Sequence, residues 1–214
     1  MIHMIETFQS VWTSQDLGAK TIQHLEMFFW ALLLSILFGI LIGILIYKKK
    51  QLADIVFHLL NTIELIPTLA LLILLLPLLG LGSGPTIAAC ILYSLLPIAR
   101  NTYTGLISVN KEYLQAAQGI GLSSKEILLN IRIPYALPHI IGGIRIAIVF
   151  TMGVVTLGGV IAAGGLGQSI QTGLQFNKPD IIIVSSIWVG ILAVIFDLFA
   201  GMLERALIRR NHLG

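Results

Sequence analysis

Long apolar stretches separated by short polar or basic segments dominate the chain. A bilayer core about 30 Å thick takes about 20 helical residues to cross. Five runs have about that length: residues 27–47, 55–79, 86–106, 140–163 and 181–208. Backbone groups in lipid need internal hydrogen-bond partners, so each run is expected to be a helix, with Pro67 and Pro77 only kinking the second. The pattern predicts an all-α integral membrane protein with about five transmembrane helices.

Composition supports a membrane protein over a soluble one. Hydrophobic residues make up 57% of the chain and charged residues 11%, against about 25% charged in soluble domains. The net charge of +3 does not indicate nucleic-acid binding, because the basic residues lie between apolar runs and form no patch. We find no internal repeat or linker, so residues 1–214 are taken as one domain with a core at 21–208. The segment before Thr21 is expected to be a short surface helix or a frayed end.

The basic residues predict an orientation, since loops rich in lysine and arginine stay in the cytoplasm. In a five-span arrangement only Lys20 and Lys178 fall on the other side. The cytoplasmic side would hold Lys48, Lys49, Lys50, Lys111, Lys125, Arg132, Arg205, Arg209 and Arg210. This places the N-terminus outside, the C-terminus inside and residues 108–139 in the cytoplasm. No cleavable signal peptide is evident.

Residues 108–139 are expected to form a helix-turn-helix. The helix ends are marked by glycines and a capping box: Gly119, Gly121, Ser123 and Glu126. Pro134 and Pro138 are expected to stop the second helix before the fourth span. Apolar Ile127, Leu128 and Ile131 on one face would fit a groove on a partner.

Seven residues of this segment have the spacing of a known signature: Gln115, Ala116, Ala117, Gly121, Ile131, Ile133 and Pro134. The segment resembles the cytoplasmic loop of permease subunits of binding-protein-dependent ABC importers, whose pattern is Glu-Ala-Ala, three residues, Gly, nine residues, then Ile-x-Leu-Pro. Gln115 replaces the usual Glu, so an ion pair to the ATPase would become a neutral hydrogen bond or vanish. The ATPase-docking residues that follow from the resemblance and the apolar face are Gln115, Ala116, Ala117, Gly121, Ile127, Leu128, Ile131 and Pro134.

Three further strings are similar to osmoprotectant permeases, over about residues 61–174. They are Ile-Pro-Thr-Leu-Ala at 66–70, Leu-Pro-Ile-Ala-Arg-Asn-Thr-Tyr-Thr-Gly at 96–105 and the glycine-rich stretch 156–167. Glu64-Leu65 departs from the Gln-Thr that is more frequent in the family. The resemblance implies import of quaternary amines such as glycine betaine, carnitine or choline by alternating access.

The implied partners are two ATP-binding-cassette subunits, a second permease copy or paralogue, an extracytoplasmic binding protein and the lipid of a bacterial plasma membrane. The chain has no Gly-Lys-Ser/Thr phosphate loop, so ATP would be bound by the partner. Its histidines lack ligand spacing and no nucleophile, base or metal constellation is visible, so we expect a non-catalytic subunit without cofactor or metal. Aromatic residues are scattered, which favours amine recognition by the binding protein.

Charged residues inside the predicted spans are candidate functional groups. Glu64 and Arg100 lie at comparable depths, and the hypotheses are a structural pair, pathway lining or proton coupling. Arg145 and Asp197 form a looser candidate pair. The pathway or gate candidates are Glu64, Arg100, Tyr103, Thr151, Met152, Val155 and Thr156.

The small residues of the fourth run allow close helix packing or, alternatively, a gate at a two-fold interface. They are Gly153, Gly158, Gly159, Ala162, Ala163, Gly164 and Gly165. Two rival functions remain. One is an ABC importer of another small solute such as methionine. The other is an ion-coupled carrier using Glu64 and Asp197, which a 214-residue chain without inverted repeats disfavours.

Overall fold

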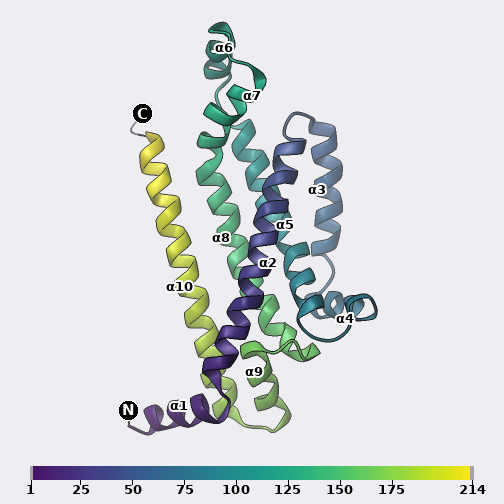
Figure 1. Ribbon diagram of the computed structural model, residues 1–214, viewed down its shortest axis with the longest axis vertical. Helices are drawn as coiled ribbons and strands as arrows, with labels where there is room; N and C mark the ends of the chain where they lie inside the picture. The colour runs from purple at the N-terminus through teal and green to yellow at the C-terminus, as the bar shows by residue number, and fades with distance from the viewer. Residues whose placement is uncertain (1, 213–214) are drawn as a thin grey trace.

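The computed structural model describes residues 2–212, with side chains from 6 to 209, and this part of the chain is helical without a strand (Figure 1). The predicted all-α class is therefore confirmed. Met1, Leu213, Gly214 and the Arg210 side chain, which the predictions include, lie outside the described part. The helices are α1 (Ile2–Ser14), α2 (Leu17–Ile46), α3 (Lys50–Glu64), α4 (Thr68–Leu79), α5 (Ser83–Ile107), α6 (Lys111–Gly119), α7 (Ser124–Ile127), the π-helical turn η1 (Leu128–Arg132), α8 (Ile133–Leu157), the 3-10 turn η2 (Gly158–Ile161), α9 (Gly165–Gln175) and α10 (Pro179–His212).

Three described helical segments are long and apolar enough to cross a membrane: residues 17–46, 124–161 and 179–209. The pair α3 and α4 would make a fourth span. Helix α5 has 25 residues, about 37 Å at 1.5 Å per residue, and packs against α2, α3, α4 and α8. Its buried polar residues Ser94 and Thr102 make hydrogen bonds to Thr151 and to the Ile98 carbonyl. All five predicted runs are helical, but the count of five membrane crossings is approximate.

The second predicted span is broken, not kinked. Helices α3 and α4 meet at 96° across Leu65–Pro67. Pro67 lacks an N–H and disfavours helical geometry at Ile66, which ends α3. The Tyr93 hydroxyl of α5 donates a hydrogen bond to the Ile66 carbonyl. This bond satisfies a backbone oxygen that the break frees.

The expected stop at Pro134 and Pro138 is also wrong. The predicted helix-turn-helix at residues 108–139 is called the docking segment below. Residues 124–161 run as one helical segment from it into the fourth predicted span. Within η1 the Ile133 N–H donates to the Leu128 carbonyl, one residue wider than in an α-helix. The proline ring at 134 would clash with a carbonyl four residues earlier in a regular helix. The wider turn lets the helix continue past Pro134.

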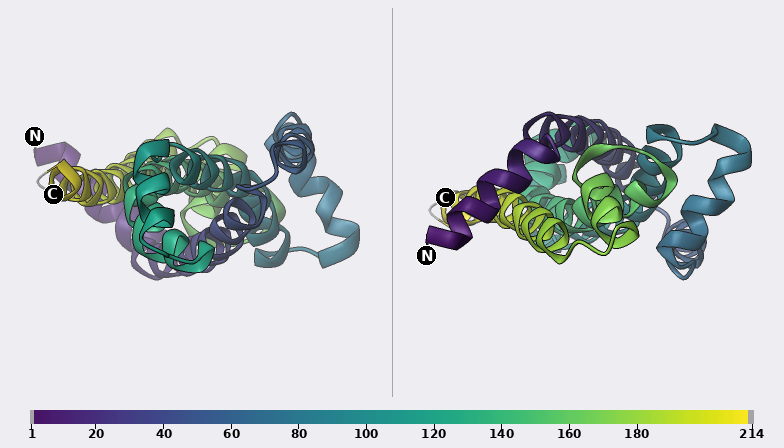
Figure 2. Two further views of the ribbon diagram at one scale, coloured as in Figure 1. Left: turned by 90° about the horizontal axis from the view of Figure 1, so that it is seen from above. Right: turned by 90° about the horizontal axis from the view of Figure 1, so that it is seen from below.

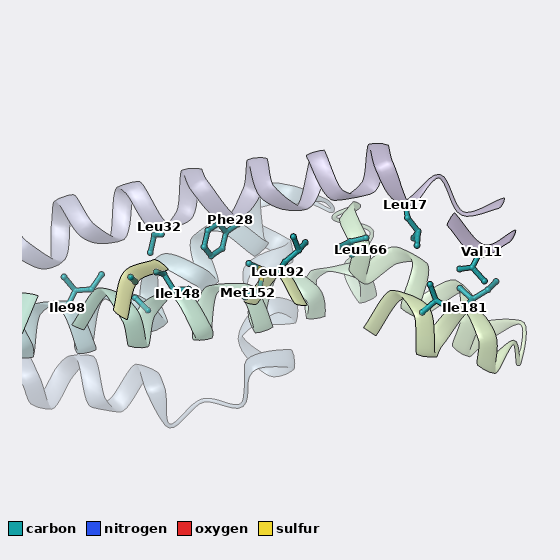
Figure 3. Packing of buried hydrophobic residues seen from close by; sticks show 13 residues of the cluster. Val11, Leu17, Phe28, Leu32, Ile98, Ile148, Met152, Leu166, Ile181 and Leu192 are labelled. Atoms are coloured by element: carbon teal, nitrogen blue, oxygen red, sulfur yellow. The ribbon is translucent and has the colours of Figure 1, made fainter. Parts of the chain in front are cut away.

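The largest buried apolar cluster joins α1, α2, α5, α8, α9 and α10 (Figure 3). Phe28 on α2, Ile148 and Met152 on α8 and Leu192 on α10 meet in its middle. Near the N-terminus, Trp12 packs edge-on against Trp188 with ring centroids 5.2 Å apart. Residues 2–14 therefore form a helix that rests on the molecule, which agrees with the first predicted alternative, a short surface helix.

The two ends of the molecule differ. Helices α6 and α7 lie at one end, where α10 finishes, and α1 and α9 lie at the other (Figure 1). Viewed along the long axis, α3 and α4 project to the side opposite α1 and the end of α10 (Figure 2). The docking segment thus lies at the same end as the C-terminal helix turn.

Candidate functional site

The docking segment is built by helix caps that the sequence encodes locally. The Asn110 side chain accepts the Glu112 N–H at 3.0 Å and starts α6. Gly121 has φ +89°, a conformation that side chains rarely adopt, and it turns the chain after α6. Ser123 Oγ accepts the Glu126 N–H at 3.3 Å, and Glu126 Oε2 accepts the Ser123 N–H at 2.8 Å. The predicted capping box and helix-turn-helix are confirmed.

Two apolar docking candidates in α7 and η1 pack within the chain itself. Ile127 is buried, and Leu128 packs against Leu106, Ala136 and Ile140. These two docking candidates therefore hold the segment to the body of the molecule. Ala117 is also buried, and Ile131 is partly buried.

The exposed part of the segment consists of other residues. Of the docking candidates, Gln115, Ala116, Gly121 and Pro134 are exposed. The exposed surface also includes two large residues that the sequence reasoning missed. Tyr113 is 65% exposed and Ile120 is 80% exposed. An isoleucine between two glycines of a turn has no core to fill, and this was the signal available in the sequence.

A groove of about 550 Å³ lies between the docking segment and the corner after α2. It is lined by Tyr47, Lys48, Ile107, Val109, Lys111, Leu114, Gln118, Ser124, Ile127 and Arg132. Arg132 donates to the Leu106 carbonyl and lies over the Tyr47 ring, with Cζ 5.4 Å from the ring centroid. Three cations predicted to share one side of the membrane, Lys48, Lys111 and Arg132, thus line one groove.

Arg100 and Tyr103 line a second hollow of about 370 Å³, between α3 and α5. Arg100 Nη2 donates to Asn61 Oδ1 at 3.3 Å, and its Cζ lies 5.4 Å from the Phe57 ring centroid. Tyr103 packs edge-on against the same ring at 5.4 Å. Two pathway candidates are therefore neighbours around Phe57.

Glu64 does not pair with Arg100 here. It ends α3 at the break, is partly buried, and forms no salt bridge among the described residues. Arg100 binds Asn61, one helical turn before Glu64. The hypothesised ion pair is absent, while the pathway role of Glu64 stays a prediction.

The gate candidates on α8 are mostly core residues. Thr151, Met152 and Val155 are buried within the chain. Thr151 Oγ1 lies 3.0 Å from Ser94 Oγ, and Met152 Sδ lies 3.2 Å from His24 Nε2. Thr156 is partly buried and donates to the Met152 carbonyl at 2.8 Å. These contacts describe packing, and a gating role stays a prediction.

The glycine-rich element after α8 packs backbone against backbone. A Cβ on Gly167 would lie 1.9 Å from the Thr156 carbonyl oxygen, and one on Gly159 would lie 2.2 Å from the Gly167 carbonyl carbon. Gly153, by contrast, has nothing within 4 Å of such a Cβ. The small residues therefore serve close packing near the end of α8, and Gly153 does not take part within this chain.

Arg145 on α8 binds two carboxylates of α10. Its Nε and Nη2 lie 3.0 Å from Asp197 Oδ1 and Oδ2, and Nη1 lies 2.9 Å from Glu204 Oε2. The predicted Arg145–Asp197 pair is confirmed, and Glu204 is an addition that sequence reasoning missed. We call these three residues the α8–α10 clamp.

Residues 35–210 match the family described as "binding-protein-dependent transport system inner membrane component". The chain is 36% identical to the choline transport system permease protein OpuBB of Bacillus subtilis (strain 168), covering 97% of this chain and 94% of that protein. It is 39% identical to the glycine betaine/carnitine/choline transport system permease protein OpuCB of the same organism, covering 93% and 92%. It is 38% identical to the osmoprotectant import permease protein OsmW of Salmonella typhimurium (strain LT2), covering 85% and 86%.

Solved structures give the same fold. An inward-facing MetNI methionine ABC transporter superposes with a TM-score of 0.79 at 22% identity, over 87% of this chain and 94% of that one. An amino acid ABC transporter gives 0.71 at 19% identity, over 95% and 98%. Because the family match covers most of its length, the chain belongs to the inner-membrane permease components of binding-protein-dependent transport systems.

Proposed function

We propose that this chain is the permease subunit of an ATP-driven importer for quaternary-amine osmoprotectants such as glycine betaine, carnitine and choline. The observation that supports the substrate class most is the 36–39% identity, over nearly the whole chain, to the OpuBB and OpuCB permeases. A methionine permease is the rival. Its support is the MetNI likeness at 22% identity, which extends to the fold alone.

The proposed assembly holds two copies of the permease, or this chain and a relative, with two ATPase subunits and an extracytoplasmic binding protein. The exposed residues Tyr113, Gln115, Ala116, Ile120 and Gly121 would contact the ATPase. ATP binding would close the ATPases, move the docking segments together and open the pathway outward. The chain itself supplies no covalent chemistry in this cycle.

The orientation in the membrane follows from charge. Lys48, Lys111 and Arg132 line one groove. Lys111 begins α6, which lies with α7 at one end of the molecule (Figure 1). Excess lysine and arginine retain a segment in the cytoplasm. We place this end and the C-terminus in the cytoplasm, and α1 and α9 outside.

The function can be tested by growth. A bacterial strain lacking its own osmoprotectant uptake systems would receive this permease with its ATPase and binding protein. We expect growth in high-salt medium to be restored by added glycine betaine, carnitine or choline. Rescue of a methionine auxotroph on limiting methionine, without osmoprotection, would favour the rival.

A further inference from the structure

The α8–α10 clamp fixes the register of two helices. Asp197, Gly201 and Glu204 lie at spacings of four and three residues, so they share one face of α10. The guanidinium of Arg145 lies over Gly201, where an added Cβ would be 3.2 Å from Cζ. Across the contact, a Cβ on Gly142 would be 3.3 Å from Glu204 Oε1. The two glycines give the charged groups the room to meet.

Breaking this contact would be costly. The side chains of Arg145, Asp197 and Glu204 are 37%, 32% and 24% exposed and lie on helices long and apolar enough to cross a membrane. A charge that loses its partner inside the hydrocarbon core of a membrane is left uncompensated. The planar guanidinium donates three bonds at once, which a lysine ammonium cannot reproduce with the same geometry. Helix α10 therefore resists sliding along α8 or separating from it.

The clamp lies on the same continuous helical segment as the docking region. Residues 124–161 run without a break from α7 through η1 into α8. Arg145 is 21 residues after Ser124, about 31 Å along the helix. A displacement of α7 is thus carried to Arg145 without an intervening loop.

Helix α10 leads from the clamp to the opposite end of the molecule. There it packs against α9 and α1, with Trp188 stacked edge-on against Trp12. Trp188 Nε1 also donates to Thr21 Oγ1 on α2 at 2.9 Å. Movement of α10 would reach this end through side chains that are already in contact.

We propose that Arg145 is a positioning residue that makes α10 move together with α8 when the partner ATPase displaces the docking segment. The clamp would thereby transmit ATPase closure to the end of the permease that bears α1 and α9. The proposal rests on the importer function proposed above.

The test uses the complete transporter in proteoliposomes, with solute uptake and ATP hydrolysis measured in the same sample. We expect Arg145→Gln to lower the number of solute molecules taken up per ATP about fivefold or more, the lower range of coupling between sites. Arg145→Lys, which keeps the charge, should fall between Arg145→Gln and wild type. Arg205→Gln is the matched control, because it removes the same charge from an exposed position on α10 outside the clamp.

A purely structural role gives a different result. It would reduce the amount of assembled transporter, so uptake and hydrolysis would fall together and their ratio would stay constant. That outcome overturns the proposal.

If Arg145→Gln does not assemble, Glu204→Gln is the second variant to test, because it keeps the two bonds between Arg145 and Asp197. An unchanged ratio in Glu204→Gln and Arg145→Lys would then contradict it.

Spin labels at Val149 on α8 and Leu198 on α10, both exposed, provide a second readout. In the wild type their separation should stay constant between the nucleotide-free and ATP-bound states. In Arg145→Gln it should change between the states.

The two proposals fail in different ways. If the wild-type transporter carries none of the amines, the proposed function fails. If it carries them and the variants leave both the label separation and the uptake per ATP unchanged, only the clamp proposal fails.

Discussion

Single residues at the ends of short helices set the shape of the docking segment. Asn110 and Ser123 cap the starts of α6 and α7, and Gly121 supplies the turn between them. Helices of nine and four residues have little stability of their own, since most helical stability comes from packing and caps. Changes at these few positions should therefore act on docking before they act on the fold.

Gly121→Ala should weaken binding of the ATPase. Its φ of +89° is strained for any residue with a Cβ, at a cost of about 1–2 kcal/mol. We expect less ATPase to co-purify with the permease. Gly119→Ala is the control, because a Cβ there meets nothing within 4 Å and its φ is ordinary. Equal ATPase recovery with both variants would contradict this account.

Gly167→Ala should destabilise the permease itself. A Cβ placed 1.9 Å from the Thr156 carbonyl oxygen forces the backbone apart, and such overpacking costs about 1–3 kcal/mol or more. The measurement is the thermal unfolding midpoint in detergent. Gly153→Ala should not lower it, because its Cβ would project into open space and alanine favours the helix more than glycine does. A midpoint for Gly167→Ala at the wild-type value would refute the packing described for this element.

At the scale of elements, one helical segment extends from the docking region into the membrane. The π-helical turn η1 accommodates Pro134, so α7 and α8 form one continuous path. The turn also sets the rotation of α7 relative to α8, because each extra residue in a helix rotates the following face by about 100°. Docking geometry and span geometry are linked at this turn.

Pro134→Ala should uncouple ATP hydrolysis from uptake without unfolding the chain. Without the proline ring, η1 can relax to a regular α-helix and rotate the docking face. We expect lower solute uptake per ATP in proteoliposomes at unchanged thermal stability. Pro138→Ala, four residues further along inside α8, serves as the control and should retain coupling. Wild-type coupling in Pro134→Ala would show that the turn has no such role.

The elements show how far the sequence alone could predict this structure. Apolar run length located α2, α5, α8, α10 and the broken pair α3 and α4, and the capping box and Gly121 located the turn between α6 and α7. Proline gave two errors of opposite kind: Pro67 breaks the second run at 96°, whereas Pro134 interrupts nothing. The effect of a proline depends on its surroundings. At Pro67 the Tyr93 hydroxyl binds the Ile66 carbonyl that the break frees. At Pro134 the wider turn η1 avoids the clash between the proline ring and a carbonyl.

The direction of side chains was harder to predict than the helices. Ile127 and Leu128 were assigned to a partner because apolar faces fit grooves. Within the chain Ile127 is buried and Leu128 packs against Leu106, Ala136 and Ile140, so their role in docking stays a prediction. Arg145 found Asp197 as expected, while Glu204 was overlooked because it lies seven residues further along α10. Pairings of this kind depend on helix register, which periodicity does not provide.

For the whole molecule, the proposed orientation gives transport a direction across the membrane. In this proposal the end with α6, α7 and the groove of Lys48, Lys111 and Arg132 lies in the cytoplasm. The opposite end, with α1 and α9, is placed outside. Solute would therefore enter from the α1 and α9 end.

Cysteine labelling of intact cells should verify this direction. Cys90 is the single cysteine and is buried, so Cys90→Ala provides a clean background. In that background Lys178→Cys should react with a membrane-impermeant maleimide in intact cells. Lys49→Cys should react only after the membrane is permeabilised. Both positions are exposed, so the reverse pattern would show the opposite orientation.

This chain is proposed to form the pathway of an ATP-driven osmoprotectant importer. The most direct test of this claim is uptake of labelled glycine betaine, carnitine and choline into proteoliposomes holding the permease, its ATPase and its binding protein. We predict accumulation of at least one of these amines that requires ATP and all three components. Accumulation driven by a proton or sodium gradient without the ATPase, or ATP hydrolysis coupled only to another solute such as methionine, would contradict the claim.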